Sequence, residues 1–203
     1  DKRPYHTVAV RFRARSWRCG RPRTDRTDAP GRCEETKNYS GGLFTPGMQI
    51  RQATTDDAAA IVDDLWMPFA EELAELDEYN ALASDIRSDA IEYREEKLAQ
   101  SDYCVQLAVE DGAFVGFASG RVKSSPPVFE RGAALAISEL YVRPDWRRQG
   151  VASSLLDALE AWGDERGYET VSLSVNADND AAKALYESVG FEVKRVKMVK
   201  RGE

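Results

Sequence analysis

From residue 48 onward, the apolar positions repeat with a period of two or of about 3.6, which predicts alternating strands and helices. The segment MQIRQA (48–53) alternates as a short strand. Thr54 or Thr55 can cap a following helix, because their hydroxyls accept hydrogen bonds from free backbone N–H groups. Asp56 and Asp57 would then lie in the first turn, where negative charge is favourable. This stretch therefore predicts a strand followed by a capped helix.

The helix after this strand has one apolar stripe that a proline interrupts. Its apolar positions are Ile61, Leu65, Phe69, Leu73 and Leu76. Pro68 lacks the backbone N–H that a helix interior needs, so we expect a kink or two helical pieces. A second helix is expected over about 85–99.

The segments that follow are mostly strand-like. YCVQLAVE (103–110) and AFVGFASGRV (113–122) flank a DG turn, which is typical of a β-hairpin. We expect three more strands, over 133–142, 170–175 and 191–200. A helix ending near Gly167 separates the first two of these, and its buried stripe is Val151, Leu155, Leu159 and Trp162. A short helix over about 180–188 separates the last two. This order predicts an α/β (α+β) fold with a mixed, mostly antiparallel central sheet flanked by helices.

Charge divides the chain near Met48. Residues 1–47 hold 11 Lys and Arg against 5 Asp and Glu, whereas residues 48–203 hold 17 against 30. The first segment has few aliphatic residues and no sustained period, so it cannot bury enough apolar area to offset its ordering entropy. We expect residues 1–47 to be a basic, disordered extension or an artefact, with Met48 as the true start. Residues 48–203 are expected to form one domain.

Several classes of catalytic and metal site lack their usual residues. The single histidine, His6, and two of the three cysteines, Cys19 and Cys33, precede residue 48. The expected domain therefore contains no histidine for a nucleophilic triad, and we expect no metal site. Cys104 lies in an apolar strand and is interpreted as a small core residue. No run of about 18 apolar residues occurs, so we expect no membrane partner and a cytoplasmic location.

The segment RRQGVA (147–152) lies where the strand ending at Val142 gives way to a helix. A helix N-terminus offers unpaired backbone N–H groups and a partial positive charge. Gly150 lets an anion approach the backbone closely, and Arg147 and Arg148 add charge. The turn therefore suits a pyrophosphate, although an arginine-rich solvated turn would have a similar sequence.

A second motif lies downstream of this turn. ELYVRPDWRRQGVASSLL (139–156) is followed by VNADNDAAKALYESVGF (175–191). Together the two segments resemble the GNAT superfamily of acetyl-CoA-dependent N-acetyltransferases. The order of elements from Met48 onward agrees with the acyl-CoA N-acyltransferase fold of that superfamily. The resemblance implies an enzyme that transfers an acetyl group from acetyl-CoA, as co-substrate, to a primary amine.

The resemblance also implies roles for individual residues. The backbone of Leu140, Tyr141 and Val142 would end a strand that diverges from its neighbour, and would pair with the pantetheine arm. Asn176 and Asn179 would hydrogen-bond the same arm, and Asn179 can also be a helix N-cap. The pyrophosphate would be held by the turn and the first helical residues, Arg147, Arg148, Gln149, Gly150, Val151, Ala152 and Ser153.

The implied chemistry is direct attack of an amine on a thioester within a ternary complex. Tyr186 would contact the cofactor near its sulfur, and its hydroxyl, although a weaker acid than the thiol, would protonate the leaving thiolate if it is well placed. Tyr186 would otherwise be a half-buried core residue. Glu139 is the candidate base that takes the proton of the amine. The alternatives for this carboxylate are orienting the substrate or a structural role.

The acceptor site is expected between the N-terminal helices and the last strands. It would include Trp66, Glu71, Glu72, Glu75, Asp77, Glu78 and Tyr79. Their acidity favours a cationic partner, which would be a small-molecule amine, a protein N-terminus or a lysine. Because acidic residues are spread over the whole domain, their role could equally be solvation. The acceptor and the oligomeric state stay open, with a homodimer as one alternative.

Two functions of another class compete with the enzyme. One is a non-catalytic module that binds acetyl-CoA as a sensor. The other is a nucleic-acid-associated protein whose basic arm binds the nucleic acid while the fold acts as a scaffold. Tyr186 and Glu139 favour the enzyme, and we do not expect a nucleic-acid partner.

Overall fold

A computed structural model of the protein describes residues 47–200. The predicted basic extension, apart from its last residue, lies outside the described residues. So do His6, Cys19 and Cys33.

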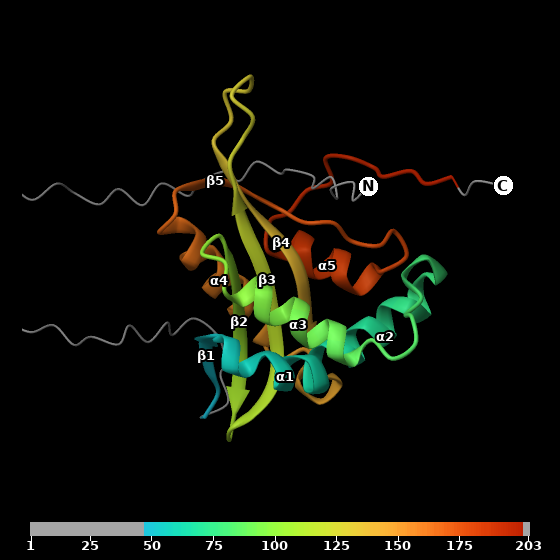
Figure 1. Ribbon diagram of the computed structural model, residues 1–203. Helices are drawn as coiled ribbons and strands as arrows, with labels where there is room; N and C mark the ends of the chain where they lie inside the picture. The colour runs from blue at the N-terminus through green and yellow to red at the C-terminus, as the bar shows by residue number, and fades with distance from the viewer. Residues whose placement is uncertain (1–46, 201–203) are drawn as a thin grey trace, which may run out of the picture.

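The described chain is built around one five-stranded sheet (Figure 1). In spatial order, which is also chain order, the strands are β1 (Gln49–Gln52), β2 (Tyr103–Glu110), β3 (Ala113–Lys123), β4 (Ala133–Val142) and β5 (Tyr168–Ser172). Neighbouring strands are antiparallel except β4 and β5, which are parallel. The prediction of a mixed, mostly antiparallel sheet is confirmed.

Helices cover both faces of the sheet. They are α1 (Ala58–Ile61), α2 (Met67–Leu76), α3 (Arg87–Leu98), α4 (Val151–Asp164) and α5 (Asp180–Ser188). In the view of Figure 1, α1 and α3 cross in front of the sheet and α4 lies behind it. The helical regions predicted from the apolar stripes are therefore confirmed, although α4 ends three residues before Gly167.

Strand β2 shows why the sheet needs helices on both sides. Cys104 and Ala108 point into the core under α4, whereas Val105 and Leu107 point into the core under α1. This alternation follows from the period of two in a strand. All four side chains are buried. Burial raises the pKa of the Cys104 thiol to about 12, which agrees with its interpretation as a core residue.

The predicted cap and the predicted break of the first helix are both present. The Thr54 backbone N–H donates to Asp57 Oδ2 at 2.8 Å. A hydrogen bond from Arg51 and further bonds from Thr54 outweigh partial burial and lower the pKa of Asp57 to about 2. Between α1 and α2 the chain forms one π-helical turn, Val62–Trp66, and Pro68 lies in the first turn of α2. The helical run continues past Pro68 through this π-helical turn, in which the Met67 N–H donates to the Val62 carbonyl.

The prediction of a strand over 191–200 is wrong. This segment has no regular secondary structure, and β5 ends at Ser172 rather than near residue 175. Phe191 is buried, but Val193, Val196 and Met198 are exposed. The apolar positions change phase between residues 193 and 196, so no single face of a strand could bury them.

No helix within residues 47–200 is long and apolar enough to cross a membrane.

Candidate active site

Strands β4 and β5 separate before β4 ends. Their last paired residues are Ala136 and Ser172, although β4 continues to Val142. Residues 137–142 therefore have a partner strand, β3, on one side only. The predicted divergence of the strand that ends in Leu140, Tyr141 and Val142 is confirmed. Because the carboxyl ends of parallel strands lie at the same sheet edge, the segments after β4 and β5 meet here.

The segment after β4 is the arginine-glycine turn, which leads into α4. Arg148 and Gly150 have φ angles of 64° and 82°, so the backbone is left-handed at both positions. A Cβ built on Gly150 would meet no atom within 4 Å, which shows open space beside the turn. The first hydrogen bond of α4 runs from the Ser154 N–H to the Gly150 carbonyl. The N–H groups before Ser154 are therefore the first ones of the helix, which have no carbonyl one turn earlier in the helix to bond to. Val151, Ala152 and Ser153 thus offer their N–H groups at the start of the helix.

Arg147 and Gln149 stabilise the turn in this structure. Arg147 Nε donates to the carbonyl of Val142 at 2.8 Å, and its Nη2 forms an ion pair with Glu72 of α2 at 2.6 Å. Gln149 Nε2 donates to the Asp145 carbonyl at 2.8 Å. The ion pair between Arg147 and Glu72 has no signal in the sequence, because 74 residues separate the two positions. Arg147 therefore joins the turn to α2.

The segment after β5 carries the two predicted asparagines. Asn179 Oδ1 accepts from the backbone N–H of Ala182 at 3.0 Å, so Asn179 is the N-cap of α5. Asn176 Oδ1 accepts from the Asp178 N–H at 2.8 Å, and its amide donates to Asp77 at 3.4 Å. Both side chains thus lie at the edge where the strands diverge, and the N-cap role of Asn179 is confirmed.

Tyr186 lies on α5 and packs against the core under α4. Its ring centroid is 5.6 Å from that of Phe191. Burial raises the pKa of Tyr186 to about 12, so the hydroxyl keeps its proton throughout the neutral range. A protonated hydroxyl can donate to a departing thiolate but cannot act as a base.

Glu139 is held by a network of donors. Its carboxylate accepts two hydrogen bonds from Arg94 of α3, at 2.8 and 3.1 Å, and one from Ser119 at 2.6 Å. Trp66 supplies a further hydrogen bond. Burial alone would raise the pKa of Glu139, but the charge and hydrogen bonds of Arg94 outweigh it, so the pKa is lower than usual. A carboxylate with these partners favours the orienting or structural alternative over the base.

Helix α2 and the turn after it lie beside this edge of the sheet. Glu72 contacts Arg147, and Asp77 contacts Asn176, so α2 touches the segments that follow both β4 and β5. Glu71, Glu75 and Tyr79 are exposed. The acidic residues predicted for the acceptor site are thus divided. Glu72 and Asp77 contact the segments that follow β4 and β5, whereas Glu71 and Glu75 are exposed to solvent.

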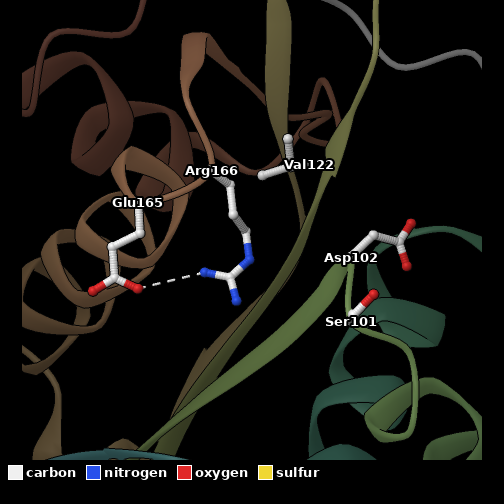
Figure 2. A pocket seen from close by; sticks show the side chains of 5 residues that line it. All are labelled: Ser101, Asp102, Val122, Glu165 and Arg166. Atoms are coloured by element: carbon white, nitrogen blue, oxygen red, sulfur yellow. Dashed lines mark ion pairs between the residues drawn. The ribbon is translucent and has the colours of Figure 1, made fainter.

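A hollow of about 550 Å³ lies elsewhere, lined by Ser101, Asp102, Val122, Glu165 and Arg166 (Figure 2). Val122 pairs with Leu135 near the start of β4, so the hollow is at the opposite end of the sheet from the divergence. Its one cation, Arg166, stacks on Trp162 at 4.1 Å and pairs with Glu165 at 3.6 Å. We therefore place the candidate site at the divergence. Within residues 47–200, no group of three or more His, Cys, Asp or Glu side chains could hold a metal ion.

Comparisons with known proteins identify the family of the chain. The model of the acetyltransferase (GNAT) family matches residues 59–191. The aminoglycoside N(6′)-acetyltransferase type 1 of Salmonella typhimurium is 28% identical over 106 residues, which cover 48% of this chain and 68% of that enzyme. The [ribosomal protein bS18]-alanine N-acetyltransferase of Escherichia coli K12 is 50% identical over 50 residues, which cover 25% of this chain and 34% of that one.

A solved structure shows the same fold. It is the aminoglycoside N-acetyltransferase AAC(6′)-Iy in complex with CoA, with a TM-score of 0.62. The likeness covers 78% of this chain and 99% of that chain, at 20% sequence identity.

Proposed function

The chain belongs to the GNAT family of acetyltransferases, and on this premise we propose that it moves the acetyl group of acetyl-CoA to a primary amine by direct attack in a ternary complex. The observation that carries the proposal is the free end of β4 beside the N-terminus of α4. There the unpaired side of residues 137–142 lies next to the turn that contains Gly150. Family membership makes the protein an acyltransferase and disfavours a non-catalytic sensor.

The residues at this edge fit acetyl-CoA. The N–H groups of Val151, Ala152 and Ser153 and the partial charge of α4 suit the pyrophosphate, and the open space beside Gly150 lets it approach. The free backbone of Leu140 to Val142 and the amide of Asn176 are suited to the pantetheine arm. Acetyl-CoA supplies the activated acetyl group as a thioester.

Two side chains are proposed to take part beyond binding. Tyr186 donates a proton to the departing thiolate, which its raised pKa permits at neutral pH. Glu139 keeps β4 in position instead of taking the proton of the amine, because its carboxylate is already engaged by Arg94 and Ser119. The proton of the amine then passes to water, and Tyr186 regains its own proton from water. Proximity of the two substrates supplies most of the rate enhancement.

The acceptor is proposed to be a cationic amine. The relatives named above acetylate aminoglycosides and a ribosomal protein, by their names, and both kinds of acceptor carry positive charge near neutral pH. Exposed Glu71, Glu75 and Tyr79 beside the site agree with such a ligand. The test is CoA release from acetyl-CoA in the presence of an aminoglycoside, a polyamine, a peptide with N-terminal alanine and a lysine peptide. We expect at least one of them to be acetylated.

Residues 48–203 are expected to bind acetyl-CoA as tightly as the full chain. All proposed contacts with acetyl-CoA lie after residue 138, so removing residues 1–47 removes none of them. Titration calorimetry on both proteins measures the two dissociation constants. A loss of affinity of more than about tenfold, or 1.4 kcal/mol, on truncation would assign the basic segment a part in binding.

A further inference from the structure

Arg94 is a charged side chain in the interior of the described part of the chain. It projects from α3 and is only 1% exposed. Its guanidinium forms the bidentate pair with Glu139 and also donates to the Tyr103 hydroxyl at 2.9 Å. The same group lies 5.6 Å from the centre of the Phe117 ring. Arg94 therefore connects α3 to β2, β3 and β4 beneath the helical layer.

Glu139 lies next to an irregularity in β4. Ser119 of β3 pairs with Glu139, but the next residue, Gly120, pairs with Ile137. Ser138 is thus an extra residue without a partner on β3, which is a β-bulge. A bulge bends its strand, and the residues that follow it here, Leu140 to Val142, stay paired with β3 but have no pairing with β5. The orientation of the free end of β4 depends on how this bulge is held.

Fold stability alone is a weak explanation for the pair of Arg94 and Glu139. A buried ion pair gains little over well-packed apolar residues of similar volume, because both charges lose their hydration. Arg94 Nε is also buried without a hydrogen-bond partner among the described residues, which adds to the cost. The two parallel hydrogen bonds from Arg94 to Glu139 are directional, so they can fix the position of the Glu139 carboxylate relative to α3.

We propose that Arg94 is a positioning residue for acetyl transfer. It holds the Glu139 carboxylate and so fixes the bulge at Ser138, which orients the β4 backbone proposed to contact acetyl-CoA. This inference rests on the proposed function. It assigns catalytic importance to a helix that contributes none of the residues proposed to contact acetyl-CoA.

The test compares Arg94→Met with a matched control, Arg87→Met. Arg87 lies on the same helix and also forms a bidentate pair, with Asp63 at 2.7 and 2.6 Å, but both partners are exposed. We expect Arg94→Met to lower kcat about 100-fold, the effect of a small misplacement of reacting groups. The dissociation constant of acetyl-CoA should change by less than about threefold, because ground-state binding is kept. Arg87→Met should leave both constants unchanged.

Hydrogen exchange gives a readout that is independent of activity. In Arg94→Met, exchange of the amides in a peptide over 136–142 should speed up by about tenfold or more, while other strands keep their protection. Unchanged exchange at this peptide would overturn the proposal. If the wild-type protein acetylates no amine, the proposed function fails, and this exchange result still decides the role of Arg94.

A double variant separates positioning from stability. Arg94→Met with Glu139→Met replaces the pair by apolar side chains and should fold with near-normal stability. We expect its kcat to stay low by the same factor from about pH 7 to pH 10. Recovery of kcat together with stability would make the pair merely structural. A deficit that disappears at high pH would make Glu139 the base. Either result would overturn the proposal.

Discussion

Replacing Gly150 by valine is expected to weaken acetyl-CoA binding about 100-fold or more. Gly150 has a φ of 82° directly before α4, in a conformation that β-branched residues avoid. The added side chain would occupy the open space beside the turn and shift its backbone. Losing two hydrogen bonds to a charged pyrophosphate at about 1.5 kcal/mol each corresponds to about this factor. Titration calorimetry with acetyl-CoA measures the change.

Gly112 offers a matched control for this substitution. It has a φ of 80° in the turn between β2 and β3, and its Cβ would also meet no atom within 4 Å. Gly112→Val carries the same backbone strain, of about 1–3 kcal/mol, away from the site. It should therefore lose stability but keep its affinity for acetyl-CoA. Normal binding by Gly150→Val would mean that RRQGVA does not hold the pyrophosphate.

Replacing Tyr186 by phenylalanine is expected to lower kcat about 10²–10⁴-fold, the usual contribution of a general acid. The ring and its contact with Phe191 remain, so the fold and the affinity for acetyl-CoA should be nearly unchanged. The measurement is kcat with the best acceptor, together with the dissociation constant of acetyl-CoA.

Tyr168→Phe is the control for this substitution. Tyr168 is another partly buried tyrosine whose pKa is raised, by burial and by Glu160, but it lies at the start of β5, away from the divergence. Removing the Tyr168 hydroxyl should change kcat by less than about twofold, because this hydroxyl does not contact the reacting groups. An unchanged kcat in Tyr186→Phe would leave Tyr186 a packing residue. Normal kcat with weak binding would make it a contact of acetyl-CoA only.

Local patterns were sufficient to predict most of the fold. The nearly continuous apolar run in 103–110 suits β2, which is buried on both faces, and the DG turn fixes its pairing with β3. Pro68 correctly predicts two helical pieces, although the π-helical turn between them has no distinctive sequence. The segment 191–200 was misassigned because its apolar positions alternate only up to Val193 and change phase before Val196.

Long-range contacts could not be predicted in the same way. Arg94 lies in a strongly polar helix, RSDAIEYREEKL, where nothing distinguishes a buried arginine from its exposed neighbours. Its partner Glu139 lies 45 residues further along the chain. A single sequence therefore identified Glu139 as a candidate carboxylate but could not tell that an arginine engages it. The start of α5 after its N-cap Asn179, in contrast, follows from a local signal and was predicted correctly, whereas α3 begins two residues after its expected start.

The most direct test of the account is the mass of both partners after the protein has reacted with acetyl-CoA and a responsive amine. The account predicts an acceptor that is one acetyl group heavier, one CoA released for each product, and a protein of unchanged mass at every time point. An acetylated protein that passes its label to the amine would contradict direct attack. Binding of acetyl-CoA without product from any aminoglycoside, polyamine or peptide amine would contradict the proposed acetyl transfer itself.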